Sequence, residues 1–119
     1  MQNRYLIDTN IIIYSINGGL ELPEASYYMS QVSYNEIFSY KKMSEEEALS
    51  IKKVLDQIEI LDTNNTIAHN TTQIQKKYKL STADSTICAT AHTYSLTLIT
   101  NDKALHQVTE IETELFYFA

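Results

Sequence analysis

With 119 residues, 44% of them hydrophobic, the chain can bury one core, but it is too short for two independent cores and too apolar for a disordered protein. Its two glycines and one proline leave no flexible linker, and its single cysteine excludes an internal disulfide and favours a reducing compartment. The net charge of −6 is ordinary for a small soluble domain, but it argues against binding nucleic acid by bulk electrostatics.

We expect a single domain over residues 1–119 and a cytoplasmic location. The longest apolar runs are far too short to cross a bilayer, so no membrane association is expected. The N-terminus enters a strand-like run at once and shows no secretory signal.

Short apolar runs alternate with helix signals along the chain. Continuous apolar runs suit strands covered on both faces, whereas apolar residues three and four positions apart mark helices. Serine followed three residues later by an acid is the capping box that opens a helix. In chain order we predict a strand at 5–7, a short helix from Ile11 stopped by Asn17-Gly18-Gly19, a strand at 26–32, a helix opened by Ser33-Tyr34-Asn35-Glu36, a helix opened by Ser44 and reaching Gln57, a strand at 58–61, a helix from near Thr66, a helix opened by Ser81-Thr82-Ala83-Asp84, a strand at 96–100 and a strand at 114–118.

This alternation predicts the fold class. Strands separated by helices form a parallel sheet, so we expect an α/β fold with a central, mostly parallel sheet of four or five strands and helices on both faces. In such sheets the functional site lies beyond the carboxyl ends of the strands, where the strand order reverses. Residues that follow the predicted strands are therefore the first candidates for a site.

Two acids, Asp8 and Asp102, directly follow apolar strand segments. If the two strands are neighbours, these carboxylates emerge side by side at one edge of the sheet. Each acid alone is equally compatible with a turn or a helix cap, since aspartate favours both positions. Asp62 follows another predicted strand, and we expect it to cap the helix near Thr66 rather than to join the other acids.

Two further acids, Glu36 and Asp84, stand at the third helical position of the predicted capping boxes. An acid there satisfies backbone N–H groups and suits the positive end of the helix dipole, so capping alone can explain both. Asp84, however, precedes Ile87, Cys88 and Ala91 by three, four and seven residues, which places it on a buried stripe. A carboxylate buried there must be paired, hydrogen-bonded or bound to a metal.

Together the four acids predict a metal site. Like charges at one edge raise one another's pKa and repel unless a cation lies between them. Oxygen ligands alone favour one or two Mg²⁺ or Mn²⁺ ions, and such cations also offset the acidic net charge. His69, His92 and His106 have no spacing that predicts a zinc site or a catalytic dyad, so we expect them at the surface or satisfied within the fold.

Four segments carry these acids: Leu6-Ile7-Asp8-Thr9-Asn10-Ile11-Ile12-Ile13, Ser33-Tyr34-Asn35-Glu36-Ile37, Asp84-Ser85-Thr86-Ile87-Cys88-Ala89-Thr90-Ala91 and Leu98-Ile99-Thr100-Asn101-Asp102. In this order they resemble the PIN-domain family, and within it the VapC-type toxins of type II toxin–antitoxin pairs. The resemblance spans essentially the whole chain. It departs from the family in the interval from Asp8 to Glu36, which is short at 36 − 8 = 28 positions and implies a missing helix or hairpin, and at Ala83, where a proline is common.

The resemblance implies a PIN-like domain that cleaves RNA phosphodiester bonds by metal-assisted hydrolysis. It assigns Asp8, Glu36 and Asp102 to the metal, and Asp84 to a second metal position or a metal-bound water. Three polar residues would orient these ligands from behind, namely Thr9, Asn10 and Thr100. Asn101 is an alternative ligand to the adjacent Asp102.

As a toxin of this kind, the protein would form a homodimer and bind a small antitoxin that supplies a basic residue to the acidic pocket. One alternative is a PIN-like binding module that has lost turnover. Another is a phospho-acceptor receiver domain, which needs paired acids at the first strand and a lysine after the last strand. The chain lacks both of those arrangements, and all four acids of the nuclease are present.

Overall fold

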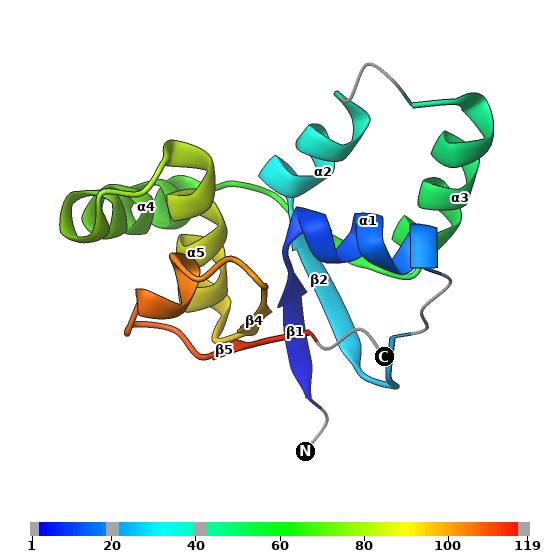
Figure 1. Cartoon of the computed structure of the whole chain (residues 1–119). Coiled ribbons are helices and arrows are strands. Elements are labelled where there is room, and N and C mark those ends of the chain that lie inside the picture. Colours follow the sequence, from blue (N-terminus) through cyan, green and yellow to red (C-terminus); the bar gives the residue numbers. More distant parts are fainter. Residues whose placement is uncertain (1–2, 19–21, 40–42, 117–119) are drawn as a thin grey trace.

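The computed structural model describes residues 3–18, 22–39 and 43–116, with the side chains of 15–18 excepted (Figure 1). Its elements are β1 (Arg4–Ile7), α1 (Thr9–Gly18), β2 (Ser26–Ser30), α2 (Gln31–Phe38), α3 (Glu45–Leu55), β3 (Glu59–Leu61), α4 (Asn65–Tyr78), α5 (Thr82–Tyr94), β4 (Thr97–Ile99), the 3₁₀ turn η1 (Leu105–Gln107) and β5 (Thr113–Glu114). No helix within these ranges is long and apolar enough to cross a membrane.

The five strands form one parallel sheet in the order β3-β2-β1-β4-β5. The central strand β1 pairs with β2 on one side and with β4 on the other, where Leu6 aligns with Leu98 and Ile7 with Ile99. The chain builds outward from β1 to β2 and β3, and then returns to add β4 and β5 on the opposite side. The predicted α/β class is therefore confirmed, and the strand order reverses at β1.

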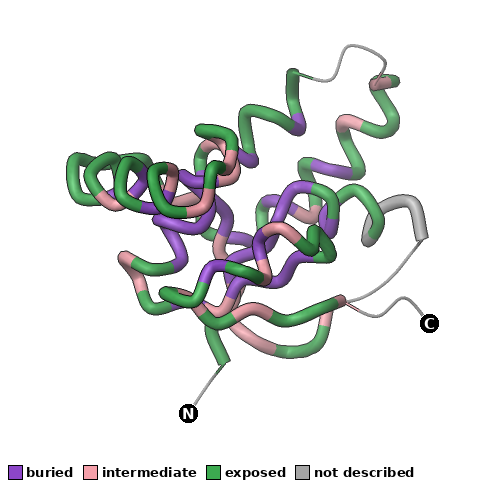
Figure 2. Tube along the Cα trace, turned by 60° about the vertical axis from the view of Figure 1, so that its left-hand side comes forward, coloured by how far each residue is buried: buried purple, intermediate pink, exposed green. Residues whose placement is uncertain are grey.

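Helices cover both faces of the sheet (Figure 1). Leu6 faces the layer of α4 and α5, where it packs with Ile87, whereas Ile7 faces the layer of α1, α2 and α3, where it packs with Ile11. Both β1 residues are fully buried, since successive side chains of a strand point to opposite faces. Figure 2 shows the buried residues gathered at the centre of the molecule. A short strand with no polar face, such as β1, suits this central position.

Side-chain caps open helices α2 to α5, and two of them differ from the prediction. Ser44 accepts a hydrogen bond from the backbone of α3 and Ser81 accepts one from the backbone of α5, as predicted. The cap of α4 is Asn64, whose Oδ1 lies 2.9 Å from the backbone nitrogen of Ile67. The prediction that Asp62 caps this helix is wrong, because the helix begins at Asn65 and Asn64 is the residue directly before it.

The helix that carries Glu36 begins earlier than predicted. Strand β2 ends at Ser30, whose Oγ accepts a hydrogen bond from the backbone nitrogen of Val32 at 3.2 Å, so α2 follows the strand without a loop. The predicted strand 26–32 is thus two residues too long, and the prediction that Ser33 is a cap is wrong, since Ser33 lies inside the helix and is fully buried. Glu36 is then the sixth residue of α2, and N-terminal capping no longer accounts for it.

The last strand is shorter than predicted. β5 comprises Thr113–Glu114, and residues 117 and 118 of the predicted strand lie outside the described residues. Beyond β5, the backbone of Phe116 forms hydrogen bonds with the side chain of Asn101 instead of with a strand. Asn101 Nδ2 donates to the carbonyl of Phe116 at 3.0 Å, and Asn101 Oδ1 accepts from the Phe116 nitrogen at 2.8 Å. This contact ties the C-terminal segment to the loop that follows β4.

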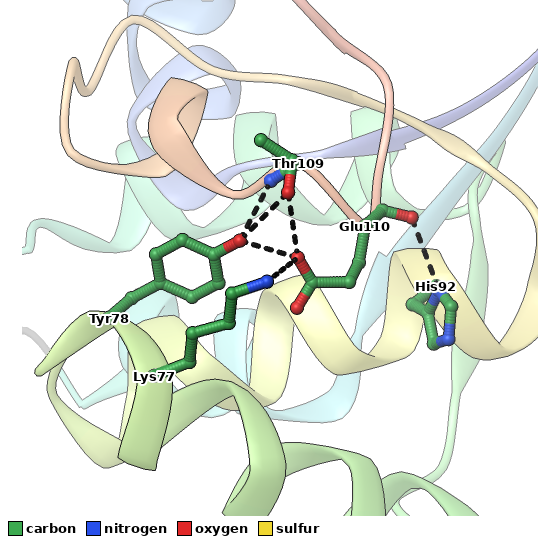
Figure 3. Close-up of polar contacts among 5 residues, drawn as sticks. All are labelled: Lys77, Tyr78, His92, Thr109 and Glu110. Carbon is green, nitrogen blue, oxygen red and sulfur yellow. Dashed lines mark hydrogen bonds and ion pairs between the residues drawn. The ribbon is translucent and has the colours of Figure 1, made fainter.

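A polar cluster ties the segment before β5 to α4 and α5 (Figure 3). The hydroxyl of Tyr78 accepts from the Thr109 nitrogen at 3.1 Å and donates to the Glu110 carboxylate, which also contacts Lys77 Nζ at 3.4 Å. His92 Nδ1 lies 3.2 Å from the Glu110 carbonyl oxygen. The Tyr78 hydrogen bond is the main cause that lowers the pKa of Glu110, so this cluster stabilises the fold at neutral pH and weakens as the pH falls through the lowered pKa.

We expect Tyr78→Phe to lower the free energy of unfolding by about 1 kcal/mol, because the Thr109 N–H and the Glu110 carboxylate both lose a partner. Urea denaturation at neutral pH measures this change. Tyr34→Phe is the control, since Tyr34 is an exposed tyrosine on α2. Equal losses in the two variants would contradict a role for the Tyr78 hydroxyl.

Candidate active site

Asp8 directly follows the central strand at the carboxyl end of the sheet, and only 8% of its surface is exposed. Its Oδ1 accepts a hydrogen bond from the Thr9 nitrogen at 2.8 Å, and its Oδ2 accepts one from Thr100 Oγ1 at 2.7 Å. Burial raises the pKa of Asp8 above its ordinary value, against the opposing effect of these two bonds, and the charges of Asp84 and Asp102 raise it further. Asp8 is thus a desolvated carboxyl group that is held in one orientation.

Asp102 reaches the same edge of the sheet from β4. Because Ile7 and Ile99 are paired residues, the chain leaves β1 and β4 at the same level. Thr100 Oγ1 donates to Asp8 and also accepts a hydrogen bond from the Asp102 nitrogen at 3.1 Å, so one hydroxyl connects the two acidic segments. The predicted pairing of the two strands that precede Asp8 and Asp102 is confirmed.

Glu36 and Asp84 approach from helices α2 and α5. Glu36 is exposed and Asp84 is partly buried. The pKa of Glu36 is raised, first by the partial burial of its carboxyl group and then by the charges of Asp8 and Asp84. With the effect of Asp102 on Asp8, these interactions show that the structure brings all four predicted acids to one region of the sheet edge.

Cys88 lies beneath these acids on α5 and is fully buried. Burial raises the pKa of its thiol to about 12, with further contributions from the charges of Asp84, Asp8 and Asp102. The thiol therefore stays protonated at neutral pH, and Cys88 is a core residue rather than a nucleophile.

The donor atoms at this edge are those that a hard divalent cation prefers, namely carboxylate oxygens. Within the described ranges, no three Asp, Glu, His or Cys side chains already converge closely enough to hold a metal ion. Mg²⁺, however, keeps several of its waters and is usually bound through only one or two carboxylates. Glu36 and Asp102 are exposed, and Asp102 Oδ1 accepts a hydrogen bond from the Ala104 nitrogen at 3.0 Å. A cation beside Asp8 would need these side chains to turn toward it.

Three buried hydroxyl groups near these acids have no hydrogen-bond partner among the described residues: those of Thr9, Ser33 and Ser85. Thr9 follows Asp8, Ser85 follows Asp84, and Ser33 lies one helical turn before Glu36. A buried hydroxyl without a partner costs about 1–3 kcal/mol, and a water molecule is its usual partner. Acids flanked by such hydroxyls fit a hydrated Mg²⁺ or Mn²⁺ better than a cation enclosed by protein ligands alone.

Of the three residues predicted to orient the ligands, two contact Asp8 and one does so in no described contact. Thr9 holds Asp8 through its backbone nitrogen and Thr100 through its hydroxyl group, whereas Asn10 is exposed as the second residue of α1. Both polar atoms of the Asn101 side chain are engaged by the backbone of Phe116, so Asn101 is not available as a ligand in place of Asp102.

Some residues near the site carry no signal in the sequence. Nothing in the spacing of Ser33, Ser85 or His106 distinguishes them from ordinary helix or surface residues, and only burial and contacts reveal them. Asp62, in contrast, follows the edge strand β3 and lies two strands away from β1.

A family model of the PIN domain matches residues 5–111. The chain belongs to the PIN-domain family. No curated protein matches the sequence. The predicted resemblance is thereby confirmed for the family.

Solved structures share the fold of this PIN domain. VapBC2 from Rickettsia felis, bound to a DNA fragment from its promoter, has a TM-score of 0.82 at 19% identity, with 96% of this chain and 99% of that chain covered. DNA-bound VapBC from Salmonella typhimurium has a TM-score of 0.81 at 20% identity, with 95% and 98% covered. A toxin–antitoxin complex from Klebsiella pneumoniae has a TM-score of 0.76 at 26% identity, with 90% and 94% covered. Nuclease activity and the use of divalent metal ions are typical of the PIN family.

Proposed function

We propose that this PIN domain is a Mg²⁺- or Mn²⁺-dependent endoribonuclease and the toxin of a toxin–antitoxin pair. The observation that carries the proposal is the buried Asp8 carboxyl group at the point where the strand order reverses. Asp84 and Asp102 are close enough to raise the pKa of Asp8, and Asp8 and Asp84 are close enough to raise that of Glu36. Such a concentration of like charge is unfavourable unless a cation binds there, which supports a metal-dependent reaction.

Each acid has a distinct part in this proposal. Asp8 is the fixed ligand, because the hydrogen bonds from Thr9 and Thr100 orient both of its oxygens. Glu36 and Asp102 are the exposed ligands, and the Ala104 nitrogen orients Asp102 by donating to its Oδ1. Asp84 completes a second cation position or orients a water from the start of α5. When bound, Mg²⁺ or Mn²⁺ supplies Lewis acidity toward the phosphodiester and a nucleophilic water.

Membership of the PIN family supports RNA as the proposed substrate, and RNA suits the acidic chain only when cations are present. At a net charge of −6, the protein repels a polyanion over long distances. Bound cations offset the charge of the acids and offer the phosphate a positive centre at the sheet edge, so substrate binding and chemistry depend on the same ions.

We further propose a cytoplasmic homodimer that binds a small antitoxin. An antitoxin partner is supported by the toxin–antitoxin complex from Klebsiella pneumoniae, which shares the fold. Several large apolar side chains are exposed on α1, α2 and α3, namely Ile13, Tyr14, Tyr34, Phe38 and Leu49. On α2, the rings of Tyr34 and Phe38 lie 4.9 Å apart. Exposed apolar groups concentrated on three helices support a protein partner at this surface, and the nearby acids support a basic residue in that partner.

The second candidate is a PIN-like binding module without turnover. It is favoured by the absence, among the described side chains, of three acids that already converge to hold a metal ion. The two candidates make the same prediction for RNA binding and opposite predictions for RNA cleavage.

Removal of divalent cations is expected to lower RNA cleavage by on the order of 10²–10³-fold, and excess Mn²⁺ is expected to restore it. The measurement uses purified protein, a mixed RNA substrate and a comparison of Mg²⁺, Mn²⁺ and EDTA. Cleavage that persists in EDTA would contradict the metal-dependent reaction. Binding of Mn²⁺ and RNA without any cleavage would identify the binding module.

A further inference from the structure

His106 connects the loop that carries Asp102 to the rest of the sheet edge. It lies in η1, between β4 and β5 (orange in Figure 1), and both of its ring nitrogens make contacts. Nε2 lies 2.7 Å from the carbonyl oxygen of Thr100, and Nδ1 lies 2.6 Å from Thr113 Oγ1. A carbonyl oxygen can only accept, so Nε2 carries the proton, and in the neutral ring Nδ1 accepts from the Thr113 hydroxyl.

Thr100 is the residue through which His106 reaches the acids. Thr100 is fully buried, and each of its polar groups has a partner. Its nitrogen donates to the Glu114 carbonyl at 3.1 Å, and its hydroxyl donates to Asp8 Oδ2 at 2.7 Å and accepts from the Asp102 nitrogen at 3.1 Å. The His106 ring supplies the donor to the remaining group, the carbonyl oxygen. The imidazole therefore fixes the peptide plane that leads from Thr100 toward Asp102.

The loop from Thr100 to His106 is closed at both ends. At its start, the Thr100 hydroxyl binds the Asp102 nitrogen, and at its end the His106 ring returns to the Thr100 carbonyl. Between them, Leu105 is fully buried, and its nitrogen donates to the Asp102 carbonyl at 3.1 Å. Leu105 anchors the turn in the core even when residue 106 is replaced. The His106 contact is therefore expected to orient the loop rather than to hold it in place.

We propose that His106 is a positioning residue for the acidic site. By donating to the Thr100 carbonyl, it keeps the Thr100 hydroxyl between Asp8 and Asp102 and so sets the distance and direction between these two acids. This inference rests on the proposed function, because those acids are the proposed metal ligands. In this proposal His106 acts through Thr100 and is not itself a ligand of the metal.

The test compares His106→Phe with His106→Gln in the full chain. Phenylalanine removes the donor, whereas glutamine keeps an N–H that can reach the Thr100 carbonyl. We expect His106→Phe to bind Mn²⁺, the probe used alone, about tenfold more weakly than the original protein, and His106→Gln to restore the affinity to within about twofold. Titrations are made well below the melting temperature of each variant.

His92→Phe is the matched control. His92 also contacts a backbone carbonyl, that of Glu110, but it lies in the polar cluster of Figure 3, where it contacts the segment before β5. The variant therefore loses a histidine–carbonyl contact of the same kind without touching Thr100. Its affinity for Mn²⁺ is expected to equal that of the original protein, even if its melting temperature falls.

A second measurement needs no metal. Hydrogen exchange of the Asp102 amide, which donates to Thr100 Oγ1, is expected to be about tenfold faster in His106→Phe and unchanged in His92→Phe. If His106→Phe matches the original protein in Mn²⁺ affinity and in Asp102 exchange, the inference is overturned, whatever its stability. If the original protein does not bind Mn²⁺, the proposed function fails, and the exchange rate still decides whether His106 holds the loop. If His106→Phe does not fold, His106→Leu takes its place, because leucine also removes the donor and has a smaller side chain.

Discussion

Asp8→Asn is expected to lower RNA cleavage by on the order of 10²–10³-fold while it raises the melting temperature at neutral pH by about 4 °C. Cleavage falls because asparagine keeps the shape of the side chain but removes the charge that draws a cation to the sheet edge. Asn also has one acceptor oxygen instead of two. It can keep the bond from the Thr9 nitrogen, while its amide faces a Thr100 hydroxyl that can turn to accept.

The gain in stability follows from the pKa of Asp8. Burial raises that pKa above the ordinary value of 3.8, so the folded state favours the protonated carboxyl group. The stability that protonation contributes is fully present below pH 3.8 and is lost as the pH rises through the raised pKa of the folded state. At neutral pH the original protein therefore carries the cost of a buried charge, which asparagine avoids, and we expect a difference of about 1 kcal/mol.

Thermal unfolding of both proteins as a function of pH tests this explanation. The advantage of Asp8→Asn is expected to shrink as the pH falls through the raised pKa and to disappear below 3.8. Asp62→Asn is the control, because Asp62 is exposed and follows the edge strand β3 rather than the central strand. An Asp8→Asn variant that cleaves RNA normally, or that is less stable at neutral pH, would contradict the role given to Asp8.

Thr100→Val is expected to lower the free energy of unfolding by about 2 kcal/mol and to weaken Mn²⁺ binding about 10–100-fold. Valine has nearly the same shape as threonine, so packing changes little. Its methyl group, however, removes the donor to the buried Asp8 Oδ2 and the acceptor for the Asp102 nitrogen. One substitution thus leaves two polar groups without their partner and releases both acids from a common anchor.

Thr100→Ser separates the hydroxyl from the rest of the side chain. It keeps both hydrogen bonds, so we expect near-normal Mn²⁺ affinity with only a small loss of stability. Thr97→Val, at the first residue of β4, controls for the same chemical change on the same strand. If isothermal titration finds equal Mn²⁺ affinity in Thr100→Val and Thr97→Val, the hydroxyl does not organise the site.

The fold class was predictable because each strand and helix carries its own local signal. The run that ends at Asp8 has no polar face, as a strand between two helical layers requires, and Ser44 and Ser81 cap the helices that follow them. The errors concern helix starts where two possible capping residues lie within a few positions of each other. Ser30 and Ser33 are equally good caps by residue type, as are Asp62 and Asn64, and the choice depends on where the strand before each helix stops pairing.

By itself, the sequence determined the α/β class and the family and named four acids as candidates, because these depend on residue types and on their order along the chain. Only the tertiary structure decided which strands are neighbours, and hence that Asp8 shares a hydroxyl with a loop 92 residues away. It also showed that Glu36 lies too far along α2 to cap that helix, and that His106 contacts the carbonyl oxygen of Thr100. Burial, hydrogen bonding and the pKa of Asp8 arise from groups that are distant in sequence, and no local pattern records how the sheet brings them together.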